Sequence, residues 1–484
     1  MSEKRSMASV IVDEVLSSKA VTFVDQYGNT QIAIEGDGNN VCEINSSTCR
    51  HWITDLSYEL LDHVPSTAIE NQVIKVLEAK ARRGGNCFNL EICISRYRNA
   101  VWYDLGSGAV RITNKNWGIV KKPPIIFRKP ANQQQQVKPK HGGDVKSLLR
   151  FVNITNESEQ LLFLCYVVAA FIPDIQHPVL VLHGTHGAGK STPMHIVKSL
   201  VDHTAIDMGS NLPKDEDALA LNAYDNYTLF FDNLSPAAMT EKLSDALSKA
   251  VTGSGFRTRR LFTNSEVFAF KFKRIVILNG ISQIVGKPDL LDRSLVMQLE
   301  RITDDKRIED SVLQAEYEAA KPQILGAILD TLVKAIVEYP KVKPKQWSRM
   351  ADFDHWGCAI AEALGYGQER FMEARNGNTK LQHDYAIEAS PVAQCLITFM
   401  EDKAEWVGTA SKLYGALEPI AEKLHLERSN VWPKDAARLK IALNSLTTNL
   451  QAKGLGMKSW RDKERMLKIY RLTDASDGTD SKNG

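Results

Sequence analysis

The chain has 484 residues, of which 43% are hydrophobic and 24% are charged. This length allows about two to four domains with a sizeable core, and the composition is that of an ordinary soluble globular protein. The formal net charge of only +2 excludes a global basic field, so any affinity for nucleic acid must come from local patches.

Seven cysteines are scattered through the sequence without a Cys-x-x-Cys pair. We expect reduced cysteines that act as small hydrophobic residues in a reducing cytoplasm. The alternative is a metal cluster formed by four of them, Cys42, Cys49, Cys87 and Cys93. Their spacings match no usual zinc template. The start of the sequence has no secretory pattern, and the longest apolar stretch, 161–172, is too short to cross a bilayer. We therefore expect a cytoplasmic protein without membrane contact.

Residues 1–128 predict an α+β module of unknown role. Alternating patterns predict strands at three places: 21–24, 89–94 and 109–113. Residues 66–83 predict an amphipathic helix that begins at a capping serine or threonine. Its basic end, 80–83, is expected to be solvated, with a nucleic-acid contact as the alternative. The module has no Asp-x-Asp or Asp-x-Glu pair to hold the two metals of a primase, so a separate primase partner is the better expectation.

The composition then changes at residue 129, before the helices and strand that precede the strongest motif. Residues 129–143 are rich in Pro, Gln, Lys and Gly and are expected to form a linker. Helical segments follow at 145–151 and 158–171, and they lead to an apolar run at 179–182 that predicts a strand.

The strongest signal follows this apolar run. It reads Gly184-Thr185-His186-Gly187-Ala188-Gly189-Lys190-Ser191, and Thr192 opens a segment that predicts a helix to residue 201. Backbone N–H groups close on a phosphate only where no Cβ intrudes, and the helix directs its positive dipole end at the same anion. We expect this loop to bind ATP, with Lys190 on the β- and γ-phosphates and Ser191 on Mg²⁺. A glycine-rich turn in a structural βα unit is the alternative.

Two further strands are expected to bring polar groups to this loop. Residues 227–233 predict a buried strand that carries Asp232 at its end, where the carboxylate would hold the Mg²⁺ shell. Residues 274–279 predict a strand that ends at Asn279, whose amide would orient the attacking water.

Arg293 stands at the end of a short helical segment, just before a strand predicted at 295–299. We expect its guanidinium to reach the nucleotide of a neighbouring subunit. The alternative is an ordinary salt bridge with Asp289 or Glu300.

A basic hairpin is expected between the second and third strands of the core. Gly-x-Gly is followed by Arg-x-Arg-Arg within 249–260, and 261–272 alternates as a strand pair around Thr263 and Asn264. In a ring this hairpin would face the channel and hold phosphates of single-stranded DNA through five cations: Arg257, Arg259, Arg260, Lys271 and Lys273. The alternative is that some of these arginines pair with the nucleotide or with acidic residues of the next subunit.

In this order the elements resemble the superfamily three helicases, an AAA+ branch, and within it the virus- and plasmid-borne group that includes poxvirus-type primase-helicases. The resemblance assigns Walker A to 184–191, Walker B to 229–233, a middle motif to 249–260 and the sensor strand to the segment ending at Asn279. It implies an α/β P-loop ATPase core at 144–340 that works as a hexameric ring on DNA during replication of a phage, plasmid or mobile element.

One position departs from the pattern of the family. Many AAA+ ATPases have a second acid after the Walker B aspartate, where this chain has Asn233. An amide positions water but accepts no proton, so the general base stays open among Asp232, Glu216 and Glu241.

The C-terminal part predicts a helical connector at 341–389, with one helix at 350–373, and a winged-helix domain at 390–472. Residues 434–471 hold ten Lys and Arg against three acids, a local charge of +7. Four of them are expected to bind the phosphates of duplex DNA: Arg438, Lys440, Lys458 and Arg461. The alternative is a winged helix that makes only protein contacts. Residues 473–484 are expected to be a disordered tail.

The leading interpretation is an ATP-dependent DNA helicase or translocase that requires ATP and Mg²⁺. The second is an AAA+ regulatory ATPase that assembles on DNA in an ATP-dependent way without unwinding it. Asn233 favours the second, since loss of a second acid would slow hydrolysis.

Overall fold

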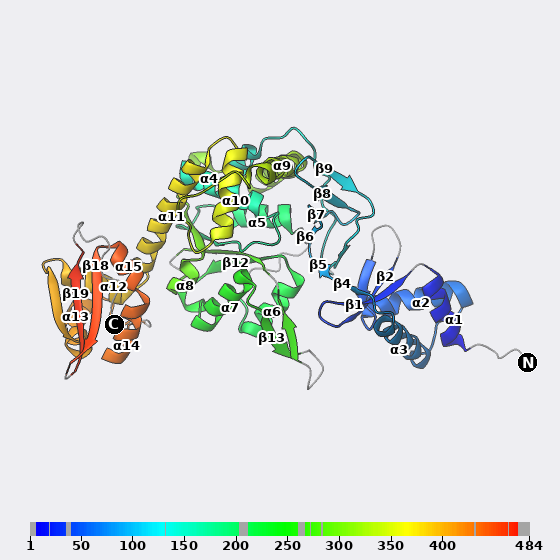
Figure 1. Ribbon diagram of the computed structural model, residues 1–484, viewed down its shortest axis with the longest axis horizontal. Helices are drawn as coiled ribbons and strands as arrows, with labels where there is room; N and C mark the ends of the chain where they lie inside the picture. Colours follow the sequence, from blue (N-terminus) through cyan, green and yellow to red (C-terminus); the bar gives the residue numbers. More distant parts are fainter. Residues whose placement is uncertain are drawn as a thin grey trace, which may run out of the picture.

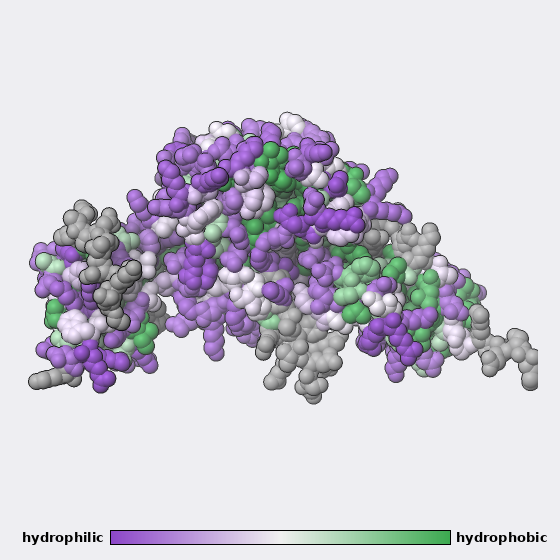
Figure 2. Space-filling model, in the orientation of Figure 1, coloured by the Kyte–Doolittle hydropathy of each residue, from purple (hydrophilic) through white to green (hydrophobic). Residues whose placement is uncertain are grey.

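The computed structural model describes residues 6–18, 20–34, 40–130, 132–202, 212–259, 267–271, 273–281, 284–429, 432–462 and 464–472. An N-terminal module, a central core and a C-terminal module follow one another along the longest axis (Figure 1). The architecture is multidomain α/β, with antiparallel, mixed and parallel sheets. The face seen in Figure 2 is mostly hydrophilic, with apolar areas gathered over the N-terminal module.

The N-terminal module packs three helices against a mixed sheet of order β3-β2-β1-β4. Its elements are α1 (Met7–Ser17), β1 (Val21–Asp25), β2 (Thr30–Ile34), β3 (Asn40–Glu43), α2 (Ser47–Leu61), α3 (Thr67–Arg83) and β4 (Cys87–Phe88). The expected helix at 66–83 is confirmed, because the hydroxyl of Ser66 accepts a bond from the N–H of Ile69 and caps α3. Its apolar stripe is buried among α1 and α2.

The expected boundary at residue 128 is wrong, because the second half of the first 128 residues packs on the central core. This half forms β5 (Leu90–Glu91), β6 (Ile94–Tyr97), β7 (Ala100–Asp104), β8 (Ala109–Ile112), β9 (Trp117–Val120) and β10 (Ile126–Phe127). The ring of Tyr103 lies 5.0 Å from that of Phe171, and its hydroxyl donates to the carbonyl of Leu200. The strand expected at 89–94 is divided at Cys93, where φ is 59°.

The expected linker at 129–143 is also packed on the core in its described part. The Gln136 side chain is buried, and its amide donates to the Tyr103 hydroxyl and to the Ser199 carbonyl, both at 2.8 Å. Lys140 lies so close to helix α9 (Asp310–Glu338) that a Cβ at Gly326 would stand 1.7 Å from the Lys140 carbonyl oxygen. Amide hydrogen bonds thus order a segment that has little apolar surface to bury.

The central sheet has four parallel strands in the order β12-β15-β11-β16. They are β11 (Val179–His183), β12 (Thr228–Leu234), β15 (Ile275–Gly280) and β16 (Ser294–Gln298), each within one residue of its expected bounds. Strand β11 lies between β15 and β16, and the chain passes from it to the edge strand β12. The loop after β11 therefore leaves the sheet at a topological switch point, where open α/β sheets bind ligands.

Helices cover both faces of this sheet. Leu180 and Ile277 face a large hydrophobic cluster, whereas Val181 and Val276 face a second cluster on the other side. The first cluster contains η1 (Val145–Phe151), α4 (Glu157–Ala169), α5 (Ser191–Val201) and α9 (Asp310–Glu338). The second face is covered by α6 (Glu216–Asp225), α7 (Glu241–Thr252) and α8 (Pro288–Leu291). Two short turns complete the core, η2 (Pro236–Ala238) and η3 (Asp304–Lys306).

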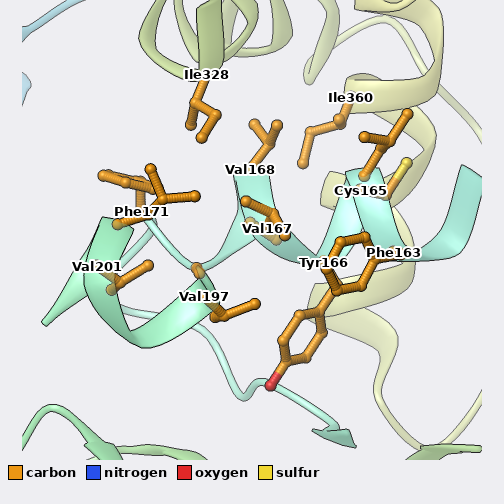
Figure 3. Packing of buried hydrophobic residues seen from close by; sticks show 14 of the residues in the cluster. Phe163, Cys165, Tyr166, Val167, Val168, Phe171, Val197, Val201, Ile328 and Ile360 are labelled. Atoms are coloured by element: carbon orange, nitrogen blue, oxygen red, sulfur yellow. The ribbon is translucent and has the colours of Figure 1, made fainter. Parts of the chain in front are cut away.

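Helix α4 is the centre of the larger cluster. Its residues from Leu161 to Ala169 are all buried, so it has no polar face. Figure 3 shows Tyr166, Val167 and Val168 among side chains from α5, α9 and α10 (Ala351–Ala363). In this described part, the expected connector at 341–389 is wrong as a separate unit, since α10 and the start of α11 (Gln368–Glu388) belong to this cluster. The single helix expected at 350–373 is divided at Gly365 and Gly367, whose φ values are positive.

The hairpin and the C-terminal module complete the described chain. Strands β13 (Phe256–Arg259) and β14 (Val267–Phe270) pair in antiparallel fashion. The turn expected at Thr263 and Asn264 lies outside the described residues, as does the expected tail at 473–484. Helix α11 leads to the C-terminal module (Figure 1). It contains α12 (Pro391–Met400), β17 (Glu405–Thr409), α13 (Ala410–Lys423), α14 (Ala436–Ser445), α15 (Thr447–Ala452), β18 (Leu455–Arg461) and β19 (Arg465–Arg471). Among the described helices, none has the length and apolar character to span a bilayer.

Candidate functional site

The candidate site is built on residues 184–191, which we call the glycine loop and which join β11 to α5. Gly187 and Gly189 have φ values of 75° and 70°, a left-handed conformation that strains residues with a Cβ. At Gly184 a Cβ would lie 2.3 Å from the carbonyl oxygen of Leu299, so the close approach requires glycine. The loop can therefore present backbone N–H groups at the N-terminal end of α5, an arrangement suited to phosphate.

Lys190 and Ser191 end the loop. The ammonium of Lys190 donates to the carbonyl oxygens of Gly184 and Thr185, both at 2.8 Å, so it lies folded over the loop. Burial lowers the pKa of Lys190, and the nearby carboxylate of Asp232 opposes this shift. The hydroxyl of Ser191 donates to Oδ2 of Asp232 at 2.8 Å. The structure thus brings Asp232 to the end of the glycine loop.

A bulge in β12 aims Asp232 at the loop. The register between β12 and β15 shifts between Phe231 and Leu234, so Asp232 and Asn233 fall outside the regular ladder. Asn233 has φ of 53°, a left-handed conformation that asparagine adopts more readily than most residues. Such bulges re-aim side chains next to active sites. Here the carboxylate of Asp232 turns to Ser191, and the backbone N–H of Asn233 turns to β15.

Asn279 joins the bulge to α5. Its Oδ1 accepts the bond from the N–H of Asn233 at 2.7 Å, and its Nδ2 donates to Sδ of Met194 at 2.9 Å. The same nitrogen is 3.5 Å from Oγ of Ser191. Because the side chain is buried and held at both ends, its amide has one orientation beside Ser191.

The contacts of the loop are compatible with Mg²⁺ and a nucleoside triphosphate. Ser191 Oγ and Asp232 Oδ2 stand 2.8 Å apart, and two adjacent ligands of octahedral Mg²⁺ are separated by about 3 Å. A hydroxyl and a carboxylate are also the oxygen ligands that Mg²⁺ prefers. A cavity of about 650 Å³ opens beside Asp232 and is also lined by Lys214, Asn233 and Thr240. None of the lining residues of this cavity belongs to the glycine loop, so it adjoins the loop only through Asp232.

Arg293 lies at the opposite edge of the sheet from the glycine loop. Ser294 pairs with Val179, the first residue of β11, whereas the loop follows His183. Four residues of strand separate the two edges by about 13 Å. Arg293 pairs with Asp289 at 3.4 Å, and its side chain is only 16% exposed. The alternative considered for Arg293, a salt bridge with Asp289, is therefore present, and Arg293 does not serve the loop of its own chain.

Two arginines near these elements were missed by the sequence analysis. Arg349 shares the carboxylate of Asp289 at 2.7 Å and is 44% exposed. Arg307 lies against the glycine loop, because a Cβ at Gly187 would stand 3.1 Å from its guanidinium. Neither arginine belongs to a recognised motif, so the sequence patterns did not single them out. Arg307 follows the strand expected at 295–299, and Arg349 lies in the expected helical connector.

The general-base candidates differ in their surroundings. Glu216 is in α6 and pairs with Lys249 at 2.7 Å, whereas Glu241 occupies the first turn of α7. Asp232 is the candidate that contacts the glycine loop directly.

The expected DNA contacts are scattered over two modules. Lys271 is exposed, but Lys273 donates to the carbonyl of Asp174. Arg257 and Arg259 lie in β13, where their side chains are outside the described residues, as is Arg260 altogether. In the C-terminal module Lys458 and Arg461 are exposed along β18, Arg438 is 59% exposed, and Lys440 is half-buried.

Comparisons with known proteins found similar solved structures and two matching family models. Two solved apo structures of the NrS-1 C-terminal region are similar, with TM-scores of 0.45 and 0.44 at 12% and 11% identity. The first match covers 96% of this chain and 99% of that one, and the second covers 97% and 100%. No curated protein sequence matches the chain.

Two family models match consecutive parts of the chain. The actinomycete integrative conjugative element replication protein, AICE RepA, matches residues 145–376, and the AICE RepA C-terminal domain matches 392–481. The first match contains the parallel sheet and helices α4 to α10, and the second contains the C-terminal module. The chain is therefore a replication protein of a mobile element, similar to those of actinomycete integrative conjugative elements.

Proposed function

We propose that the chain is an ATP-dependent DNA helicase or translocase that works as a ring in replication of its mobile element. The observation that carries this proposal is the contact of Ser191 with Asp232 at the end of the glycine loop, beside Lys190. In P-loop ATPases a lysine binds the β- and γ-phosphates, while a hydroxyl and an aspartate hold Mg²⁺. The match to a replication family supports DNA as the polymer along which ATP hydrolysis would drive movement.

The proposed hydrolysis uses groups from two subunits. Lys190 would bind the phosphates, Ser191 and Asp232 would hold Mg²⁺, and the buried amide of Asn279 would orient the attacking water. When bound, Mg²⁺ would neutralise charge that develops on the phosphates. Arg293 is about 13 Å from its own loop by strand length, so it would act on the nucleotide of a neighbouring subunit. A site completed by the neighbour supports a ring, for which we propose six subunits.

DNA would contact two basic surfaces of this ring. The base of the β13–β14 hairpin, with Lys271 exposed, is proposed to hold a single strand. The C-terminal module has the helix and hairpin order of a winged helix, and we propose that it binds duplex DNA through Lys458 and Arg461 on β18. A separate primase would then supply primers.

A regulatory ATPase that assembles on DNA without unwinding it is the second candidate. The observation in its favour is Asn233, whose backbone is held by Asn279 and whose amide accepts no proton. Glu216 is engaged by Lys249 and Glu241 lies in the first turn of α7, whereas Asp232 is the candidate base that contacts the loop. A weak base would slow hydrolysis and lengthen the ATP-bound state.

ATP hydrolysis and strand displacement by the full chain separate the two candidates. We expect wild-type protein to displace a labelled strand with ATP and Mg²⁺, and Lys190→Ala to lose both activities. Lys242→Ala, an exposed lysine of α7, is the matched control and should retain them. ATP-dependent DNA binding without displacement would favour the regulatory candidate, and full hydrolysis by Lys190→Ala would contradict both.

A further inference from the structure

A second cavity, of about 750 Å³, lies on the core between β8, β9 and the C-terminal half of α9. It is formed where four segments meet: residues 115–117 at the start of β9, the stretch 141–146, α9, and the end of α10. None of its lining residues belongs to the glycine loop or to the proposed DNA-binding hairpin. The cavity therefore needs an explanation of its own.

An aromatic pair forms one wall of this cavity. The rings of Trp117 and His141 are stacked, with centroids 3.8 Å apart and planes 23° from parallel. Oδ1 of Asp330 accepts from Nε1 of Trp117 at 2.7 Å and lies 2.9 Å from Nδ1 of His141. One carboxylate thus fixes both rings at their edges. The indole is buried, whereas the imidazole side chain is 63% exposed, so a flat surface of His141 remains open to a ligand.

Three lysines from different elements surround this surface. Lys115 precedes β9, Lys146 lies in η1, and Lys334 lies in α9, and all three are exposed. The ammonium of Lys146 stands 4.6 Å above the ring of Tyr366. Of the two lining carboxylates, that of Asp330 is engaged by the ring pair, and that of Asp144 caps η1. The lining thus has three lysines against two hydrogen-bonded carboxylates, a net charge of +1, and the lysines stand on separate elements around an aromatic platform.

We propose that this cavity binds single-stranded DNA, with one base stacked on His141 and neighbouring phosphates on the lysines. Stacking on an aromatic face needs an unpaired base, because both faces of a base are covered in a duplex. A free nucleotide carries its phosphates at one end only. A strand places a phosphate on either side of each nucleotide, which suits lysines that stand on separate elements. The site goes beyond the proposed ATPase and does not depend on nucleotide hydrolysis.

Photocrosslinking of the full chain tests the location of the strand. An oligothymidylate with one 5-iododeoxyuridine is irradiated with the wild-type protein, and the crosslinked peptide is identified by mass spectrometry. We expect a crosslink in the peptide that contains His141 or Trp117. Crosslinks that fall only in other peptides would overturn the proposal, as would equal protection by free ATP or a preference for RNA of the same sequence.

Binding of a fluorescent oligothymidylate tests the chemistry. His141→Ala should weaken binding about tenfold, the typical cost of one lost stacking contact, whereas His141→Phe should restore it.

The lysines are tested by the salt dependence of the same binding. Lys146→Gln with Lys334→Gln should lower the slope of log affinity against log salt by about 1.4, or about 0.7 for each lost phosphate. Exposed lysines of other modules serve as the matched control, Lys75→Gln with Lys423→Gln. Loss in His141→Phe equal to that in His141→Ala, or an unchanged salt slope, would overturn the proposal. Retained ATP hydrolysis in these variants separates this result from a failure of the ATPase proposal.

Discussion

The parallel sheet has a carboxyl edge, where its strands end, and an amino edge, where they begin. The charged groups at these two edges have different partners. At the carboxyl edge, the carboxylate of Asp232 contacts the hydroxyl of Ser191, and Lys190 contacts backbone oxygens. At the amino edge, Arg293 and Arg349 both pair with the carboxylate of Asp289. The first edge thus gathers an ammonium, a hydroxyl and a carboxylate at the end of the glycine loop, whereas the arginines of the second edge are already paired with a carboxylate of the same chain.

This difference teaches that one chain brings the groups of the carboxyl edge together at the glycine loop, whereas it engages the arginines of the amino edge in ion pairs of its own. A glycine loop, a bulge and a buried amide fix the first edge without help from outside. Under the proposed function, Arg293 would exchange its pairing with Asp289 for a phosphate of a neighbouring subunit. We therefore propose that the carboxyl edge binds nucleotide within one chain, whereas Arg293 at the amino edge acts only in an assembly.

The largest expected effect comes from breaking the amino edge. Arg293→Ala should lower the rate of ATP hydrolysis about 1,000-fold, as removal of an arginine finger does, while nucleotide binding remains. Mixing this variant with Lys190→Ala should restore hydrolysis, because some sites would then combine an intact Lys190 with an intact Arg293. Hydrolysis is measured on the separate and mixed proteins, with Arg349→Ala as the comparison. No restoration on mixing would place Arg293 in a structural role within its own subunit.

A smaller effect is expected from the carboxyl edge when its metal ligand is replaced. Asp232→Asn keeps an acceptor for the Ser191 hydroxyl but loses the charge that holds Mg²⁺. We expect hydrolysis to fall about 100-fold, or about 3 kcal/mol of transition-state stabilisation. A titration of the rate against Mg²⁺ should show a weaker apparent affinity for the metal. An unchanged Mg²⁺ dependence would remove Asp232 from the metal site.

Arg307 tests whether the carboxyl edge extends beyond the motif residues. Its guanidinium lies against Gly187, so we expect it to add a charged contact to bound phosphate. Arg307→Ala should weaken binding of a fluorescent ATP analogue about tenfold, since hydrogen bonds to charged groups contribute about 1.5–3 kcal/mol. Arg301→Ala, an exposed arginine of the same segment, is the control. Equal affinities of the two variants would show that Arg307 only packs on the loop.

The smallest effect concerns a carboxyl beside the carboxyl edge. Burial raises the pKa of Glu159 to about 7, although the N–H of Gln298 opposes the shift. The folded chain thus keeps Glu159 protonated where the unfolded chain has already ionised, so stability falls as pH rises from 4.5 to 7. Glu159→Gln should raise the melting temperature by a few degrees at pH 8 and leave it unchanged at pH 4. Glu157→Gln, 86% exposed in the same turn, should change neither value.

The strands of the core and helix α3 of the N-terminal module were predictable because each has a strong local pattern. The parallel strands were placed within one residue, and the capped helix α3 began at its serine. Apolar runs, capping residues and glycine spacing are properties of neighbouring residues, so no tertiary information is required. The same holds for the glycine loop, whose Gly187 and Gly189 adopt the conformation that the motif requires.

Module boundaries were not predictable from these patterns. Gln136 looked like part of a polar linker, but Tyr103 and Ser199 satisfy its amide in a buried position. Trp117 was assigned to an N-terminal module, yet its indole donates to Asp330 of α9. A polar residue is buried or solvated according to partners that are distant in sequence, and no local pattern reports them.

The sequence by itself determined which residues form the glycine loop and which strands deliver Asp232 and Asn279 toward it. Only the tertiary structure decided how these groups meet, through the bulge that turns Asp232 to the loop and the amide that holds Asn233. It also decided that Arg293 faces away from its own loop. The physical reason is that local propensity fixes each strand, whereas strand order and register fix which side chains share an edge.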